Sequence, residues 1–276
     1  MAGAIRRNEE VLAIAKESGQ KPLEAGALNN LADLHLIRGE LATAKELLTQ
    51  ADRILAQTGD KRGISIALEH WGNVLTEEND LSHARQKYEQ SLNTLAQSGE
   101  SGFLPYCKMS LAALDMEEGR TDDAIALLKP VIEDFRAQKN QGGESWALGL
   151  YARAELESGN IAAAAETTKA ANEMSMRDQT LSGLDTHLIV ARVDGLNGNR
   201  KTAETKLKSL LAIAERQGNV RLAFNVRLAL GEVALKSHDF AGRKILVDLS
   251  KDAASKGFLL VSQKALSLDR GSAGSL

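Results

Sequence analysis

The chain has 276 residues and is 43% hydrophobic, yet only 4% of it is aromatic, and it contains 3 prolines and one cysteine, Cys107. This composition favours many helices rich in Ala and Leu over a β-rich core, and a single cysteine excludes an internal disulfide. A formal net charge of −3 gives no positive field to hold a phosphate backbone, so we expect no nucleic-acid partner.

No apolar run approaches the roughly 18 residues that a membrane-spanning helix needs. Residues 6–10 read Arg-Arg-Asn-Glu-Glu, where a signal peptide would need an apolar stretch. We therefore expect a cytoplasmic protein with no membrane partner.

The spacing of apolar residues divides the chain into a succession of helices. Residues 1–20 contain one helix, near 4–17, which ends in Ser18-Gly19 as later second helices of pairs do. We therefore expect a truncated half repeat here, with a fused effector domain N-terminal to it. Residues 21–257 contain six helix pairs, 258–268 a partial terminal helix, and 269–276 a small, polar tail that we expect to be disordered.

The six pairs share one layout. We expect the first helices near residues 22–38, 62–78, 102–118, 143–158, 181–197 and 220–236. The second helices are expected near residues 41–57, 81–97, 121–138, 161–176, 200–216 and 239–255.

The turn inside each pair recurs at nearly constant intervals. A residue suited to a left-handed helix end stands at Gly39, Asn79, Gly119, Gly159, Gly198 and His238. The intervals are 40, 40, 40, 39 and 40 residues, and a fixed period of this size indicates a repeat array. In four copies the next residue offers a side-chain acceptor to the following helix: Asp80, Asn160, Asn199 and Asp239.

Small residues mark the place where the two helices of a pair should cross. The first helices contribute Ala32, Gly72, Ala112, Ala152, Ala191 and Gly231. Twelve positions later the second helices contribute Ala44, Ala84, Ala124, Ala164, Ala203 and, in the last pair, Arg243. Four positions further on stand Leu48, Tyr88, Leu128, Thr168, Leu207 and Val247. We expect Trp71 and Tyr151, which precede two of the small residues, to lie in the core.

This spacing resembles the tetratricopeptide repeat, and its closest copy is Leu68-x-x-Trp71-Gly72 followed by Ala84-x-x-x-Tyr88. The period is near 40 rather than about 34 residues and the closing proline is absent, which is similar to the MalT-like branch of the family. A HEAT-type array also fits the period, but the Ala and Gly spacing favours tetratricopeptide pairs. The resemblance implies an all-α, right-handed superhelical solenoid of antiparallel helix pairs.

The resemblance also implies a concave binding face lined by the first helices. Counting from the small residues, we select as partner-binding groove residues Asn29, Ile66, Glu69, Asn73, Tyr106, Met109, Met116, Trp146, Arg153, Leu188 and Arg192. Ile66, Tyr106 and Trp146 occupy equivalent positions, so they should form an apolar strip that anchors a protein or peptide partner. The alternative is that the two aromatic residues only cover the N-terminal ends of their helices.

Glu77, Glu117 and Glu157 occupy equivalent positions near the C-terminal ends of first helices, where carboxylates oppose the helix dipole. One interpretation is an acidic lip that selects basic peptides. The other is a solvated edge with local ion pairs, such as Arg153 with Glu157.

The sequence contains no nucleophile elbow, Walker loop or Gly-x-Gly-x-x-Gly motif, and its five histidines are dispersed. We therefore expect neither an enzyme nor a metal or cofactor site. The leading hypothesis is a non-catalytic protein-interaction module, the tetratricopeptide region of a larger bacterial regulator or signalling protein, which binds a partner helix or peptide in its groove. The alternative is a peptide or small-molecule sensor domain of a transcription regulator.

Overall fold

A computed structural model describes residues 1–99, 101–175 and 180–273 of the chain. Over these ranges the protein has fourteen α-helices, one short 3-10 helix and no strand, so it is all-α as expected. The helices are α1 (Ala2–Glu17), α2 (Lys21–Ile37), α3 (Leu41–Thr58), α4 (Lys61–Glu77), α5 (Leu81–Ser98), η1 (Ser101–Phe103), α6 (Leu104–Glu117), α7 (Thr121–Ala137), α8 (Gln141–Glu157), α9 (Ile161–Ser175), α10 (Leu181–Leu196), α11 (Arg200–Gln217), α12 (Val220–Lys236), α13 (Ala241–Ser255) and α14 (Leu259–Ala273).

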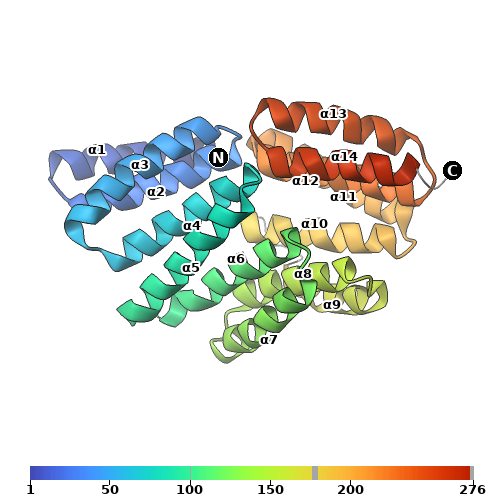
Figure 1. Cartoon of the computed structure of the whole chain (residues 1–276), viewed down its shortest axis with the longest axis horizontal. Coiled ribbons are helices and arrows are strands. Elements are labelled where there is room, and N and C mark those ends of the chain that lie inside the picture. Colours follow the sequence, from blue (N-terminus) through green and yellow to red (C-terminus); the bar gives the residue numbers. More distant parts are fainter. Residues whose placement is uncertain (100, 176–179, 274–276) are drawn as a thin grey trace.

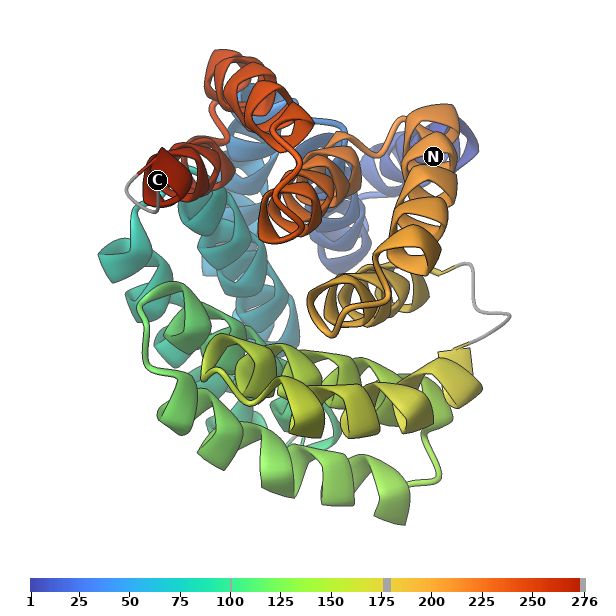
Figure 2. The same ribbon diagram turned by 90° about the vertical axis from the view of Figure 1, so that its right-hand side faces the viewer.

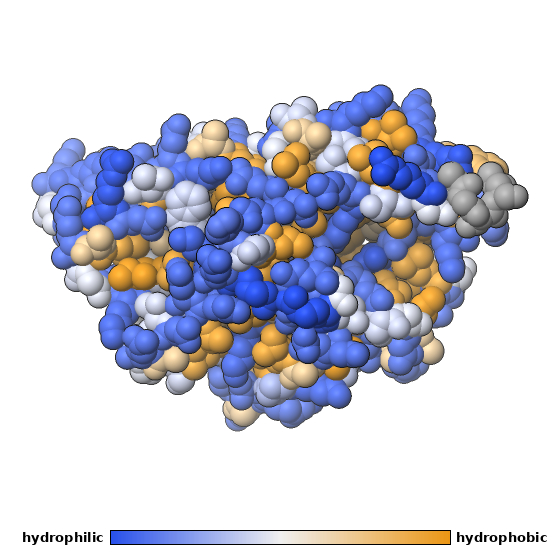
Figure 3. All heavy atoms as spheres, viewed as in Figure 1, coloured by the Kyte–Doolittle hydropathy of each residue, from blue (hydrophilic) through white to orange (hydrophobic). Residues whose placement is uncertain are grey.

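Consecutive helices pack as antiparallel pairs that stack into a solenoid (Figure 1). Each expected helix of the six pairs is present, and its ends lie within two residues of the expected positions. The face seen in Figure 3 is mainly hydrophilic, with hydrophobic residues showing in scattered patches. The apolar side chains are buried mostly where neighbouring helices meet, as a repeat array requires.

The predicted left-handed turns are confirmed at all six positions, including the two that are not glycine. Asn79 has a φ of 61° and His238 a φ of 56°. At the first of these turns the Asp80 amide donates to the Leu75 carbonyl oxygen at 2.8 Å, which closes the helix end. The helix-start prediction is right for Asp80 and Asn160, whose side chains accept from the amides three residues on.

Two of the predicted helix starts need correction. Asn199 makes no side-chain cap bond. Asp239 accepts from the Ala241 amide at 2.9 Å, and the helix begins at Ala241 rather than at residue 239.

The helix crossings confirm the alternation of small and large residues. A Cβ added at Gly72 would lie 2.3 Å from Cε1 of Tyr88, so only glycine lets this ring enter.

In the last pair the predicted register is wrong by one residue. A Cβ at Gly242 would lie 2.8 Å from the Gly231 carbonyl oxygen, so Gly242 occupies the crossing that was expected for Arg243. Leu246, which is fully buried, likewise replaces Val247.

Two further expectations are wrong. Trp71 and Tyr151 are only partly buried, because each packs against the edge of a core cluster rather than inside it. The tail that was expected to be disordered from residue 269 is helical as far as Ala273, and residues 274–276 lie outside the described part. Helix α14 continues because Val261 and Ala265 are buried and Leu268 packs on the same cluster.

The solenoid closes on itself, which the sequence did not predict. Helix α12 contacts α2, and α14 contacts α4, so the last repeats lie beside the first (Figure 2). One core cluster joins both ends of the chain, with Leu36 and Val74 on one side and Phe224 and Phe258 on the other. The first helices and α14 therefore surround a central space.

Candidate functional site

A cavity of about 1280 Å³ lies at the centre of the molecule and is lined mainly by the inner faces of α2, α4, α6, α8, α10, α12 and α14. Figure 2 shows these helices arranged around it. Its volume is somewhat above the roughly 300–1,000 Å³ of a pocket for a drug-sized ligand. We call it the central cavity.

Ten of the eleven predicted groove residues line the central cavity, namely Ile66, Glu69, Asn73, Tyr106, Met109, Met116, Trp146, Arg153, Leu188 and Arg192. The eleventh, Asn29, is only 1% exposed and donates from Nδ2 to the Gly63 carbonyl oxygen at 3.2 Å. Its position was expected to face the groove, but it faces α4 and joins two helices instead.

Both aromatic residues line the cavity, and Tyr106 also contacts the start of a neighbouring helix. The Tyr106 ring meets the Phe135 ring edge-on, with 5.2 Å between the ring centroids, and Trp146 lies 6.3 Å away. The Tyr106 hydroxyl accepts from Nδ2 of Asn140, the residue that caps the start of α8. Tyr106 therefore lines the cavity and contacts the start of α8 rather than of its own helix, α6, and its role as a partner anchor stays a prediction.

The two methionines selected as groove residues are almost fully buried. Met109 is 1% exposed and Met116 is 5% exposed, because both belong to the core cluster between α6 and α8. They form the wall beneath the half-buried rings of Tyr106 and Trp146 rather than a mobile surface.

Six charged side chains form a continuous chain of alternating sign along the cavity wall, in the order Lys264, Glu117, Arg153, Glu157, Arg192 and Glu232. We call this the charge ladder. Arg153 lies 2.6 Å from a carboxylate oxygen of Glu117 and 2.8 Å from one of Glu157. Arg192 lies 3.2 Å from Glu157 and 2.6 Å from Glu232.

The charge ladder corrects the interpretation of an acidic lip. Burial alone would raise the pKa of Glu117, but the neighbouring charges of Arg153 and Lys264 hold that pKa at about 2. The pKa of Glu157 is also lowered, since Arg153 and Arg192 outweigh its burial. Both carboxylates are therefore ionised and neutralised within the wall, and the predicted pair of Arg153 with Glu157 is present.

Glu77, the third member of the expected lip, is in a different environment. Burial raises its pKa to about 7, and Arg221 only partly opposes this. Burial also raises the pKa of Asp185 and of Glu69, and it lowers the pKa of His70. These residues line the central cavity from α4 and α10.

The sequence reasoning missed Lys264 and Arg221 as cavity residues. Lys264 belongs to α14, which reaches α6 only because the solenoid closes. Arg221 stands at the second position of α12, outside the positions counted from the small residues. Asp33 and Asp185 lie on first helices and line the cavity, but nothing in the sequence distinguished them from other polar residues of these helices.

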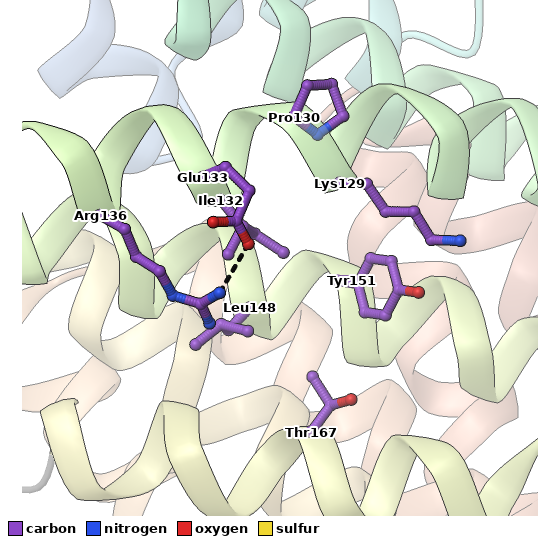
Figure 4. Close-up of a pocket in the computed structure, with 8 residues that line it drawn as sticks. All are labelled: Lys129, Pro130, Ile132, Glu133, Arg136, Leu148, Tyr151 and Thr167. Carbon is purple, nitrogen blue, oxygen red and sulfur yellow. Dashed lines mark hydrogen bonds and ion pairs between the residues drawn. The ribbon is translucent and has the colours of Figure 1, made fainter.

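A second, shallower cleft of about 450 Å³ lies on the outer face, where Tyr151 and Thr167 line it together with Lys129 and Arg136 (Figure 4). Its charged residues largely satisfy one another, as Arg136 lies 2.6 Å from Glu133.

Within the described residues, no three His, Cys, Asp or Glu side chains are grouped as a metal site requires. In the same part of the chain, no helix combines the length and apolarity needed to cross a membrane.

The paired helices, left-handed turns and small crossing residues define a tetratricopeptide-type helical repeat protein. The sequence matches the MalT-like TPR region over residues 2–240, and the chain belongs to this family. A search of curated proteins finds no similar sequence.

Solved structures with the same fold include regulators of the Rap group. A Rap protein complexed with competence and sporulation factor is 12% identical, with a TM-score of 0.66, covering 97% of this chain and 81% of its own. The Rap conjugation gene regulator of the plasmid pLS20, in complex with the Phr* peptide, is 10% identical with the same TM-score, covering 95% and 78%. Aspartyl phosphate phosphatase F from Bacillus subtilis is 15% identical, with a TM-score of 0.56, covering 94% and 73%.

Proposed function

We propose that this protein is a non-catalytic interaction module that binds a peptide, or a short helix of a partner, in the central cavity. The observation that carries the proposal is the cavity itself, whose wall combines half-buried aromatic rings with charged groups. Aromatic anchors that are partly exposed in a concave site are typical of surfaces that capture a peptide. The two Rap structures named above contain a peptide or a factor, which supports the same kind of ligand here.

We further propose that the module serves in a larger bacterial, cytoplasmic regulator or signalling protein. Membership of the MalT-like family supports this context. The groove residues selected from the sequence would then bind the ligand, with Tyr106 and Trp146 as anchors and Arg153 and Arg192 held in place by the charge ladder.

The test is selection of ligands from an equimolar library of random hexapeptides, with retained peptides identified by mass spectrometry. We expect the intact chain to retain a defined subset, and the variant Trp146→Ala to lose about tenfold or more of that retention. Tyr151→Ala is the matched control, because Tyr151 is also half-buried but lies in the outer cleft (Figure 4). Retention that Trp146→Ala leaves unchanged would place the ligand elsewhere.

A sensor function is the second candidate, and the closure of the solenoid favours it. The contacts of α12 with α2 and of α14 with α4 join the last repeats to the first beside the cavity. A bound peptide that touches both ends would tighten the closure. X-ray scattering with a retained hexapeptide should then give a smaller radius of gyration, whereas a passive scaffold keeps the same radius.

A further inference from the structure

The charges of the central cavity are distributed unevenly. On one side the charge ladder pairs each carboxylate with at least one cation. On the other side, where α2, α4, α10 and α12 meet, Asp33, Glu77 and Asp185 surround the single guanidinium of Arg221, which acts on the pKa of Glu77 and of Asp185. We call these four residues the acidic subsite. Asp33, Asp185 and the fraction of Glu77 that is ionised face one guanidinium, which leaves the subsite with an excess of negative charge.

The groups of the acidic subsite do not satisfy one another. The shortest separation between Arg221 and Asp185 is 3.7 Å, and Asp33 lies 3.8 Å from Nδ1 of His70. Both separations exceed a hydrogen bond. The Asp185 side chain is 33% exposed and that of Asp33 is 28% exposed, so both reach open space in the cavity.

Two buried polar atoms on α4 also have no hydrogen-bond partner, and one of them, in His70, lies beside Asp33. Oε1 of Glu69 makes no hydrogen bond, although Oε2 of the same carboxylate accepts from Ser110 at 2.7 Å. Nδ1 of His70 is likewise buried without a hydrogen bond. Both side chains line the central cavity. Folded proteins rarely leave such atoms unsatisfied, and an unfilled ligand site is one physical reason for doing so.

We propose that the acidic subsite holds a cationic group of the peptide ligand: the side chain of Lys or Arg, or a free amino terminus. Such groups carry only hydrogen-bond donors, which is what unsatisfied carboxylate oxygens require. The inference rests on the proposed function, because it names the class of peptide that the central cavity accepts.

The protonation of Glu77 provides an independent signature. The charged groups that act on it are Arg221 on α12, Lys264 on α14, Glu117 on α6 and Asp185 on α10, and burial outweighs them all in raising its pKa to about 7. A bound cation favours the ionised carboxylate, so binding should release protons near neutral pH. For a Lys or Arg side chain the affinity should therefore rise as the pH increases from about 6 to about 8, whereas an amino terminus loses its own charge near pH 8.

The first experiment uses two forms of the random hexapeptide library, one with free and one with acetylated amino termini, and the intact chain. We expect retained peptides to be enriched at least about fivefold in Lys and Arg over Asp and Glu. Enrichment that persists after acetylation assigns the subsite to a side chain. Retention without enrichment in Lys or Arg that is lost after acetylation assigns it to the amino terminus. Peptides that are retained equally from both libraries without enrichment in Lys or Arg overturn the inference and leave the proposed function standing, whereas retention of no peptide overturns both.

The second experiment compares variants with a retained hexapeptide as the probe. Glu77→Gln and Asp185→Asn should each weaken its binding about tenfold, and Glu133→Gln, in the outer cleft, should have no effect. Calorimetry in phosphate and in Tris buffer, whose protonation enthalpies differ, should show proton release that Glu77→Gln reduces. Equal binding by Glu77→Gln, Asp185→Asn and the wild type, with no proton release, would contradict the assignment.

Discussion

At the scale of single residues, Glu77 and Glu117 show that equivalent positions in adjacent repeats can have opposite electrostatics. Both lie at the C-terminal end of a first helix and both line the central cavity. Glu117 has two cations beside it, Arg153 and Lys264, and its pKa falls to about 2. Glu77 has no cation at ion-pair distance among the described contacts, and burial raises its pKa to about 7. The sequence could not separate them, because Lys264 is 147 positions away from Glu117 in the chain.

The first prediction is that Glu117→Gln and Glu77→Gln change stability in opposite directions. A carboxylate with a lowered pKa contributes stability above its ordinary value of 4.5, and this is lost as the pH falls towards 2. Glu117→Gln also leaves two cations without their partner, so it should cost about 3–5 kcal/mol at pH 8. A carboxylate with a raised pKa lowers stability as the pH rises from 4.5 through about 7.

Glu77→Gln should therefore stabilise the protein at pH 8 by on the order of 1–3 kcal/mol and have little effect at pH 5. Urea denaturation of both variants and the wild type at the two pH values measures this. The same loss of stability from both substitutions at pH 8 would show that the two carboxylates share one environment.

At the scale of helices, the sequence predicted more than at the scale of side chains. Local signals determine helix ends, so the left-handed turns at Asn79 and His238 could be recognised from residue type and spacing. The last pair was misread because its crossing residue, Gly242, stands one position before the one that the period indicates. Packing overrode the period there, since only a glycine fits against the Gly231 backbone.

The second prediction tests this register. Gly242→Ala places a Cβ 2.8 Å from the Gly231 carbonyl oxygen, which cannot move without disturbing α12, so it should cost about 1–3 kcal/mol. Arg243→Ala should be close to neutral or stabilising, because Nε and Nη2 of this guanidinium are buried without a hydrogen bond. Thermal melts of the two variants decide whether Gly242 or Arg243 occupies the crossing. A greater loss of stability from Arg243→Ala than from Gly242→Ala would support the register predicted from the sequence.

At the scale of the whole molecule, closure decides which residues share a site. The groove residues could be predicted because each first helix repeats the same geometry. Ten of the eleven selected residues do line one cavity. No repeat encodes how far the stack winds, so the meeting of α2 with α12 and of α4 with α14 was beyond sequence reasoning. This closure brings Lys264 to Glu117 and Arg221 to the carboxylates around it. The electrostatics of both halves of the cavity therefore depend on the closure.

The third prediction tests the closure through two equivalent glycines. Gly39 and Gly159 both have a positive φ, so an alanine at either should cost about 1–2 kcal/mol through the backbone alone. A Cβ at Gly159 meets nothing within 4 Å, whereas a Cβ at Gly39 lies 3.0 Å from Cγ1 of Val220, at the start of α12. Gly39→Ala should therefore cost about 1 kcal/mol more than Gly159→Ala and enlarge the radius of gyration in X-ray scattering.

Val220→Ala should remove this additional cost, because it makes room on the far side of the contact. In a double-mutant cycle, Gly39→Ala should then be less destabilising in the Val220→Ala background than in the wild type, whereas Gly159→Ala should cost the same in both. If Gly39→Ala and Gly159→Ala instead behave alike in both backgrounds, and neither changes the radius, then α2 and α12 do not touch in solution. The central cavity would then be an open groove, and the charge ladder would lose Lys264.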